Sequence, residues 1–258
     1  RQSIINQQNT EILFFTNEGL HIDTNTEKNC ERVFFRESFR RVNFDEIGEI
    51  SEKTNIKEKY KKALLKKVNI DVINAKKPKI AVDLSFGSTS DVYPEIVNAL
   101  NIDNIILNAY ADDKKLNKLP ATMQKSKDDL SKIVKHLEMD MAFLIYPNGQ
   151  KLEIICNDGE NTKPHITLLA VLKLLNLTSK DKKIKVLLPV SAPDFLDREF
   201  ENLSIERAKL TGAKASKLKE YDLVANLSGN FAFCDFAYSY DSIFASVKIL
   251  EMLCEANM

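Results

Sequence analysis

The sequence has no long hydrophobic run and no excess of charge of either sign. No segment approaches the roughly 18 uninterrupted apolar residues that a membrane-spanning helix needs. Lys and Arg together number 37, as do Asp and Glu, so the formal net charge is zero. Proteins that bind nucleic acid or a membrane surface through their electric field carry an excess of basic residues. We therefore expect neither a nucleic acid nor a membrane as a partner.

Cysteine and histidine are scarce, and their spacing does not predict a metal site. The four cysteines are Cys30, Cys156, Cys234 and Cys254, and the three histidines are His21, His136 and His165. The cysteines show no C-x-x-C spacing and stand among apolar or aromatic neighbours, which is typical of reduced core thiols in the cytoplasm. The histidines are far apart in the sequence, and each is predicted to be structural.

The common nucleotide-binding motifs are missing too. Segment 83–90 contains Gly and several Ser residues and is predicted to connect a strand to a helix. In that position, backbone N–H groups and the helix dipole can bind an anion. The segment matches neither G-x-x-x-x-G-K-[ST] nor G-x-G-x-x-G. A structural loop is therefore favoured over an anion site.

The composition that remains is typical of a globular protein. The 258 residues are 44% hydrophobic and 29% charged, and this length is enough for about two domains. The chain starts at Arg1 without a methionine and shows no signal peptide. We therefore expect it to be part of a longer polypeptide in the cytoplasm.

From residue 79 onward, predicted strands alternate with predicted helices. The strands are 79–83, 105–108, 141–146, 152–156, 184–189 and 205–210, with two more around a turn at 228–230. The helices are 92–100, one that starts with an N-cap box at Ser126 and Asp129, 164–175, 193–202, 212–219 and one from about 240. Before them come a short strand at 12–15 and helices at 26–35 and 54–69. This alternation indicates the α/β class, with largely parallel sheets covered by helices. We predict three units, 1–75, 76–180 and 181–258.

Residues 140–160 are the most informative stretch. Apolar runs at 141–146 and 152–156 flank a Pro-Asn-Gly turn, which predicts a strand, a turn and a strand. The stretch resembles the metal-binding loop of the phosphohexomutases (phosphomannomutase/phosphoglucomutase), where D-G-D-x-D-R joins two strands and holds magnesium. The three aspartate positions are Tyr146, Asn148 and Gln150 here, and the arginine position is Lys151.

These replacements remove the groups that would hold the ion. Magnesium requires hard oxygen ligands, usually including a carboxylate, in near-octahedral geometry. Neutral Asn148 and Gln150 beside Tyr146 do not supply that charge. We therefore expect no metal and no other cofactor at this turn, which then serves as an ordinary β-turn.

A second loop resembles another element of the same family. Residues 223–233 are similar to the sugar-recognition loop of the third phosphohexomutase domain, G-G-E-x-S-G, with Ser228 and Gly229 matching and Asn226 at the glutamate position. The resemblance implies that this position accepts hydrogen bonds from sugar hydroxyls. A neutral amide is a weaker acceptor than a carboxylate. We thus predict a remnant substrate-binding loop of Asn226, Ser228 and Gly229, with a simple turn as the alternative.

Two further motifs bear on activity. The family's phosphoserine loop, T-A-S-H-N-P, does not occur in the sequence, so we assign no catalytic residue. The block F-F-R-E-S-F-R-R at 34–41 is similar to the end of the first mutase domain. Its paired phenylalanines look most like the mutase-like region attached to mannose-1-phosphate guanylyltransferases.

The resemblance spans residues 10–257 and implies tandem mutase-like, three-layer α/β domains with mixed, largely parallel sheets. Our leading hypothesis is a catalytically depleted phosphohexomutase-like module of a sugar-1-phosphate nucleotidyltransferase, with a role in assembly or regulation. One alternative is a divergent phosphomannomutase/phosphoglucomutase whose serine loop lies before Arg1. Another is a module that binds a hexose phosphate without turnover. The implied partners are other domains of a longer parent chain, and further copies in a homo-oligomer.

Overall fold

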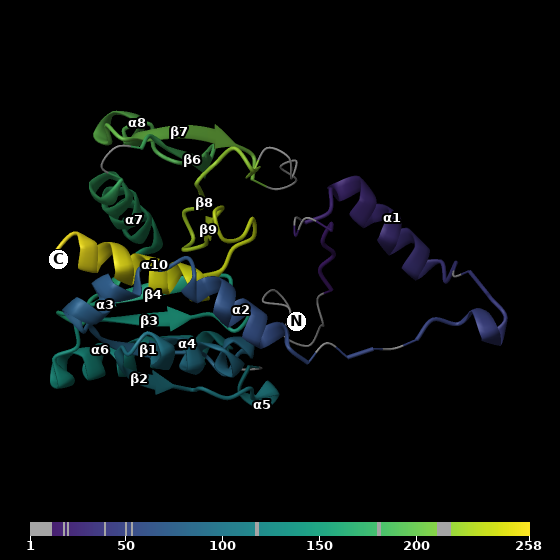
Figure 1. Ribbon diagram of the computed structural model, residues 1–258, viewed down its shortest axis with the longest axis horizontal. Helices are drawn as coiled ribbons and strands as arrows, with labels where there is room; N and C mark the ends of the chain where they lie inside the picture. Colours follow the sequence, from purple (N-terminus) through teal and green to yellow (C-terminus); the bar gives the residue numbers. More distant parts are fainter. Residues whose placement is uncertain are drawn as a thin grey trace.

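Two β-sheets, with helices between and around them, form the body of the chain (Figure 1). The computed structural model describes residues 12–17, 19, 21–38, 40–49, 51–52, 54–116, 119–179, 182–210 and 218–258. No helix within these ranges is long and apolar enough to cross a membrane.

The first sheet has five strands in the order β2-β1-β3-β4-β5. They are β1 (Lys79–Asp83), β2 (Asp103–Leu107), β3 (Met141–Ile145), β4 (Leu152–Cys156) and β5 (Asn161–Thr162). β1 is parallel to β2 and β3, whereas the β3-β4 and β4-β5 pairs are antiparallel. The two apolar runs around the Pro-Asn-Gly turn thus form a hairpin at one side of the parallel strands.

The second sheet repeats this topology with four strands in the order β7-β6-β8-β9. They are β6 (Ile184–Pro189), β7 (Leu203–Ala208), β8 (Leu223–Ala225) and β9 (Phe231–Phe233). β6 is parallel to β7 and β8, and β9 runs antiparallel to β8. The expected α/β fold, with two mixed and largely parallel sheets, is confirmed.

Helices cover both faces of the first sheet. The helices of the body are α2 (Ile56–Leu65), α3 (Ile70–Lys76), α4 (Tyr93–Ala99), α5 (Asp113–Leu116), α6 (Leu119–Leu137), α7 (Pro164–Thr178), α8 (Leu196–Glu199) and α10 (Ser242–Glu255), of which α8 packs against β7 of the second sheet. Alternate β1 residues face different layers, as the period of a strand requires. Ile80 and Val82 join a core cluster with α4, α7 and α10, whereas Ala81 joins Leu130 and Val134 of α6.

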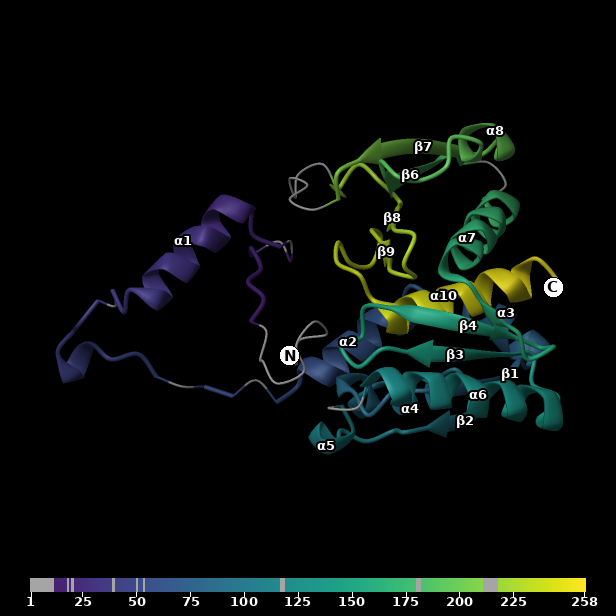
Figure 2. The same ribbon diagram turned by 180° about the vertical axis from the view of Figure 1, so that it is seen from behind.

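Helix α10 lies between the two sheets in both views of Figures 1 and 2, and it packs against α3, α7, β3 and β9. Three polar links tie it to preceding helices and the segments beside them: Tyr60 Oη to Asp241 Oδ2 (2.7 Å), Asn69 N to Glu251 Oε1 (3.1 Å) and Tyr93 Oη with Ser246 Oγ (3.1 Å). Leu64 and Ile73, from the predicted first unit, belong to the same core cluster. The two sheets therefore share one core, and the proposed domain limits stay a prediction.

Local predictions failed where tertiary contacts decide the outcome. Ser126 is not an N-cap: α6 begins at Leu119, and Ser126 is buried and hydrogen-bonded to Asp83. The helix predicted over 54–69 ends early, and Asn69 caps α3 through its side chain. The strand predicted at 12–15 is a single bridge between Phe15 and His21. The helix predicted over 193–202 is only α8, and that over 212–219 lies mostly outside the described residues.

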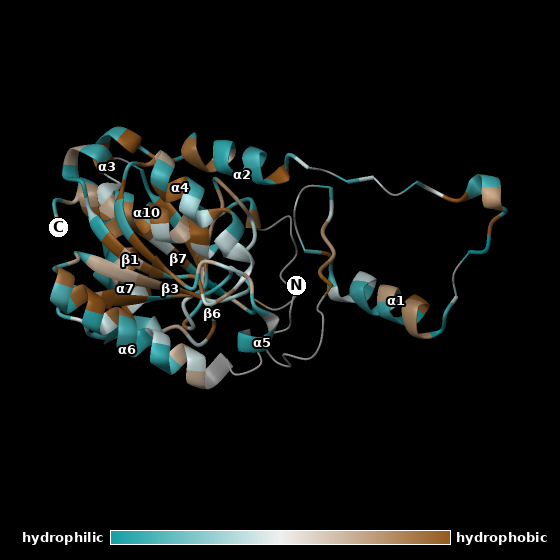
Figure 3. Ribbon diagram, turned by 90° about the horizontal axis from the view of Figure 1, so that it is seen from below, coloured by the Kyte–Doolittle hydropathy of each residue, from teal (hydrophilic) through white to brown (hydrophobic). Residues whose placement is uncertain are grey.

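Most of helix α1 (Thr24–Phe35) and the 3-10 turn η1 (Phe44–Glu46) stand apart from the body in Figures 1 and 2, whereas Thr24 and Glu27 in the first turn of α1 line a pocket with Leu218 and Tyr240. Figure 3 shows hydrophobic residues concentrated in the strands and inner helices of the body, and further ones on α1. The apolar content of α1 is therefore not used in the core described above.

Candidate functional site

Three loops meet where strands of the two sheets end. Segment 84–90 follows β1, turn 146–151 follows β3, and loop 226–230 follows β8. In open α/β sheets, ligands bind outside the carboxyl ends of the parallel strands. This junction therefore includes both loops singled out in the sequence, and it is the candidate site.

Four hydrogen bonds within turn 146–151 define its shape. Gly149 N donates to Tyr146 O (2.8 Å), and Tyr146 N donates to Lys151 O (2.9 Å). Asn148 Nδ2 donates to Gln150 Oε1 (3.1 Å), while Gln150 N donates to Asn148 Oδ1 (3.2 Å). Gly149 takes a φ of +69°, which the Pro-Asn-Gly sequence permits. The turn predicted from the sequence is thus formed by its own amides.

The side chains of this turn do not provide the ligands that a magnesium ion requires. Two neutral amides and a phenol supply no negative charge, and hard divalent cations need anionic oxygen. Within the described ranges, no three His, Cys, Asp or Glu side chains lie close enough together to hold a metal. The expectation of no cofactor remains a prediction about the whole protein.

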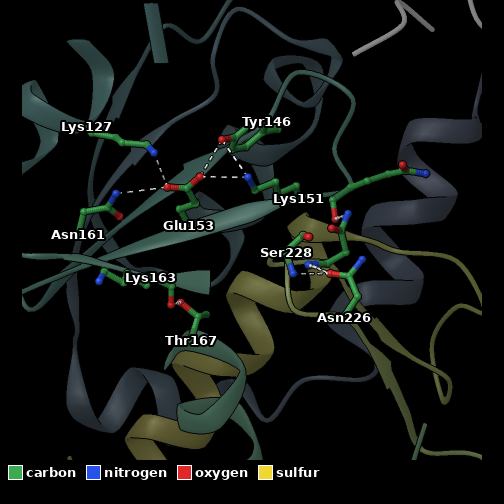
Figure 4. Close-up of polar contacts among 11 residues, drawn as sticks. Lys127, Tyr146, Lys151, Glu153, Asn161, Lys163, Thr167, Asn226 and Ser228 are labelled. Carbon is green, nitrogen blue, oxygen red and sulfur yellow. Dashed lines mark hydrogen bonds and ion pairs between the residues drawn. The ribbon is translucent and has the colours of Figure 1, made fainter. Parts of the chain in front are cut away.

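Tyr146 and Lys151 belong to a buried ionic cluster centred on Glu153 of β4 (Figure 4). The Glu153 side chain is 5% exposed and accepts from Tyr146 Oη (2.7 Å) and from Lys127 Nζ of α6 (2.7 Å). Lys151 Nζ lies 3.2 Å from the same carboxylate, 3.1 Å from Tyr146 Oη and 4.2 Å from the centre of its ring. Asn161 Nδ2 donates to the second oxygen at 3.3 Å. The side chains at the first aspartate position and the arginine position are therefore held by a structural carboxylate.

The surroundings fix the protonation state of this cluster. Burial alone would raise the pKa of Glu153, but hydrogen bonds from Lys127 and Tyr146 and the charges of Lys127 and Lys151 lower it to about 2. Burial, with the hydrogen bond and charge of Glu153, raises the pKa of Tyr146. Glu153 thus stays ionised and Tyr146 stays a donor at neutral pH.

We predict that stability falls steeply in acid because of Glu153. Its pKa of about 2 in the folded protein lies below the ordinary value of 4.5, so its contribution is complete above pH 4.5 and is lost as the pH falls toward 2. The contribution is roughly 3 kcal/mol. Denaturant unfolding at a series of pH values measures it. The stability difference between the wild type and Glu153→Gln should shrink over that range, and a difference that stays constant contradicts the assignment.

Loop 226–230 is held by Asn226. Its Oδ1 accepts from Ser228 N (2.8 Å) and from Asn230 N (3.3 Å), so the residue at the family's glutamate position shapes its own loop. Burial raises the pKa of Tyr240, and a hydrogen bond from the Asn226 side chain partly offsets this effect. Ser228 is exposed, whereas Gly229 is buried. Ser228 is thus the exposed polar side chain among the three predicted binding residues, and the binding role of all three stays a prediction.

The turn and the loop are joined directly. Lys151 and Asn230 form an antiparallel bridge, and Leu152 N donates to Gly229 O (3.0 Å). Asn230 Nδ2 donates to Gln150 O (3.1 Å). The first residue of α10 also contributes, since its backbone N–H donates to Gly149 O (2.9 Å). The two sheets therefore meet through backbone hydrogen bonds at this point.

Gly229 is required by this junction, and Gly229→Ala should destabilise the protein by about 2–3 kcal/mol. Its φ is +88°, and an added Cβ would lie 2.5 Å from Leu152 O. Chemical denaturation measures the loss. Gly19→Ala is the matched control, since Gly19 has a φ of +75° but nothing within 4 Å of the added Cβ. Equal losses in the two variants would mean that backbone strain alone, and not the close approach, acts at Gly229.

Segment 84–90 is a structural loop and not an anion cradle. Six backbone N–H groups of the segment donate to protein acceptors, those of Leu84, Ser85, Phe86, Gly87, Ser88 and Ser90. Burial raises the pKa of Asp83, which accepts from Ser85 N and Asn108 Nδ2 at 2.7 Å each. These backbone N–H groups are thus already bonded within the protein, in agreement with the absence of a glycine-rich anion-binding motif.

Sequence reasoning missed Glu153 and Lys127. The available signal was a lone carboxylate inside an apolar strand, Leu152 to Cys156. Because an unpaired buried charge is strongly unfavourable, such a residue predicts a cationic partner on the facing element. The sequence does not say which of the many lysines provides it.

Known proteins with similar sequences are phosphohexomutases. A phosphoglucosamine mutase of Finegoldia magna is 26% identical over 255 residues, covering 95% of this chain and 55% of that protein. A phosphoglucosamine mutase of Methanocaldococcus jannaschii is 24% identical over 249 residues, covering 94% and 55%. A phosphoglucomutase/phosphomannomutase of Thermococcus kodakarensis is 23% identical over 252 residues, covering 93% and 53%. The chain thus spans about half the length of the curated relatives it matches.

Solved structures show the same fold. A phosphoglucomutase/phosphomannomutase family protein from Burkholderia thailandensis superposes with a TM-score of 0.71 at 19% identity, covering 91% of this chain and 50% of that one. Parafusin, a phosphoglucomutase from Paramecium, gives a TM-score of 0.61 at 15% identity, covering 84% and 43%. No protein-family model matches the sequence. This chain is therefore related to the phosphohexomutases, in fold and in sequence over most of its length.

Proposed function

We propose that the chain is part of a phosphohexomutase-type protein that binds a phosphorylated hexose in the cytoplasm. The observation that carries the proposal is the junction of turn 146–151 with loop 226–230. These are the two segments that resemble the family's metal-binding and sugar-recognition loops, and they come from different sheets yet lie in direct contact. Similarity to mutases over most of the chain supports the same class of ligand.

The chemistry of the site limits what this part of the protein does. Turn 146–151 offers no carboxylate, so we propose that it contributes shape and position and no cation. Ser228 is exposed beside the turn and is suited to hydrogen-bond a sugar hydroxyl. Phosphoryl transfer by the whole protein would need its nucleophile and its cation from other residues.

The named relatives favour a mutase over our leading hypothesis from the sequence. The link to sugar-1-phosphate nucleotidyltransferases rests on the paired Phe34 and Phe35 of α1, which are 63% and 79% exposed. The relatives are phosphoglucosamine, phosphoglucose and phosphomannose mutases. A divergent mutase is therefore the second candidate, distinguished from a binding protein by turnover.

The test is calorimetric titration of the complete polypeptide with glucose 6-phosphate, mannose 6-phosphate and glucosamine 6-phosphate, beside the unphosphorylated sugars. We expect saturable heat with at least one phosphate ester and a weaker affinity in Ser228→Ala. Absence of heat with all three esters contradicts the proposal. A mutase assay with magnesium and a hexose bisphosphate then decides between binding alone and turnover. If turnover occurs, Asn148→Ala should leave its magnesium dependence unchanged, because that residue holds no ion.

A further inference from the structure

The second sheet has a pocket on the face that points away from α7 and α10. Alternate residues of β8 face opposite layers, so Leu223 and Ala225 join the main core with these helices, whereas Val224 faces the other way. Val224 and its cross-strand partner Ala232 form the floor of the pocket, which has a volume of about 260 Å³. Its opposite wall comes from residues within segment 13–27. The pocket is separate from the candidate site, since no described residue of the three site loops lines it.

Aromatic and apolar side chains make up most of the pocket wall. The aromatic side chains are Phe14, Tyr238 and Tyr240, and Leu210 and Leu218 add to the apolar part. The face of an aromatic ring carries partial negative charge and attracts cations. The wall therefore suits a ligand that combines apolar groups with a positive charge.

The charge at the pocket has the sign that such a ligand needs. Glu27 lines the pocket, and no Lys or Arg is among the described residues of its wall. Glu27 is exposed and forms no ion pair with a described residue. The first turn of α1 contributes about half a positive charge, but Asp23 accepts hydrogen bonds from two of its backbone N–H groups. His21 packs its ring against Phe15, with 4.4 Å between the ring centres. The two carboxylates outweigh the helix end, so the pocket favours a cation.

We propose that this pocket binds a small quaternary ammonium ion, with its methyl groups against the aromatic rings and its charge toward Glu27. Aromatic rings recognise such ions through cation–π attraction. A volume of about 260 Å³ lies below the roughly 300–1,000 Å³ of sites for drug-sized ligands, so the ion must be small. The inference goes beyond hexose-phosphate binding and does not depend on it.

Other cations suit this pocket less well. A metal ion such as magnesium or calcium needs several oxygen ligands in a defined geometry, whereas Glu27 is the one carboxylate among the described residues of the wall. A primary ammonium group is strongly hydrated and needs acceptors for three N–H groups. A quaternary ammonium ion has no N–H group, so its transfer to an aromatic and apolar wall leaves no donor without a partner.

A ligand-observed NMR titration of the complete polypeptide with choline tests the proposal. We expect saturable binding that is about 10-fold or more tighter than binding of dimethylbutanol, the neutral isostere in which carbon replaces the nitrogen. Glu27→Gln should weaken choline binding by about 3-fold, and Tyr238→Leu should weaken it by about 5-fold. Glu31→Gln is the matched control, because Glu31 lies one turn further along α1 and outside the pocket wall. Tyr240 is left intact, because it also accepts a hydrogen bond from the Asn226 side chain.

Three results would overturn the proposal. Absence of saturable choline binding would show that the pocket takes no such ion. Equal affinities for choline and dimethylbutanol would show an apolar site that does not recognise charge. Equal choline affinities in Glu27→Gln and Glu31→Gln would mean that no specific carboxylate of the pocket acts. Glu27 is exposed, so its replacement leaves the fold intact and this comparison decides even where Tyr238→Leu is unstable. None of these readouts involves a sugar phosphate, so failure here is separable from failure of the proposed function.

Discussion

Replacing Glu153 with Gln should lower the free energy of unfolding by about 3 kcal/mol at neutral pH. The substitution keeps the shape of the side chain but removes the charge that balances Lys127 and Lys151. Those two lysine side chains are only 21% and 24% exposed. Their ammonium groups would remain partly buried without a counter-charge, which is unfavourable. Urea unfolding followed by circular dichroism measures the effect.

The control for this variant is Glu95→Gln. Glu95 makes an ion pair with Lys61 at 2.6 Å, a distance similar to that between Glu153 and Lys127, but its side chain is 59% exposed. Exposed pairs contribute little, so this loss should be below about 1 kcal/mol. Similar losses in the two variants would mean that burial does not set the strength of the Glu153 cluster.

Gly87→Ala should be similarly disruptive, with a loss of about 3 kcal/mol and a visible change at the site loops. An added Cβ would lie 2.3 Å from Pro147 Cα and 2.4 Å from Pro147 O. Both contacts are with backbone, so segment 84–90 and turn 146–151 must move apart. The φ of Gly87 is −91°, which any residue adopts, so the effect is purely steric. Chemical denaturation measures the loss, and amide NMR shifts at Ser88 report the separation.

Gly48→Ala is the matched control, because no atom lies within 4 Å of a Cβ added there. Its stability should change by less than about 0.5 kcal/mol. If Gly87→Ala proves equally neutral, the two loops do not pack as closely in solution as they do in the structure. A hexose-phosphate titration of Gly87→Ala would then also be expected to match the wild type.

The strands were predictable because their signal is local. The mainly apolar stretches at 79–83, 141–146 and 152–156, the last broken only by Glu153, mark buried strands. The Pro147-Asn148-Gly149 turn was equally clear, since few other structures accommodate that sequence between two strands. The alternation of strands and helices predicted the α/β class with largely parallel sheets, but it did not predict the order of the strands within each sheet.

The site contacts were not predictable, because they depend on residues far apart in the sequence. Ser126 has the sequence features of an N-cap, yet its hydroxyl binds buried Asp83 and the helix starts earlier. Asn226 was compared with a sugar acceptor, yet its oxygen binds its own loop. In each case a tertiary contact or loop geometry overrides the local or family pattern, which a single sequence does not reveal.

The shared core has a mechanical consequence. A hinge between the two sheets would have to break the hydrogen bond from Leu152 N to Gly229 O and expose the apolar surface around α10. Both changes are unfavourable, so the two sheets should behave as one rigid body. If the protein opens and closes around a ligand, the movement would then have to come from other segments that contact this rigid body.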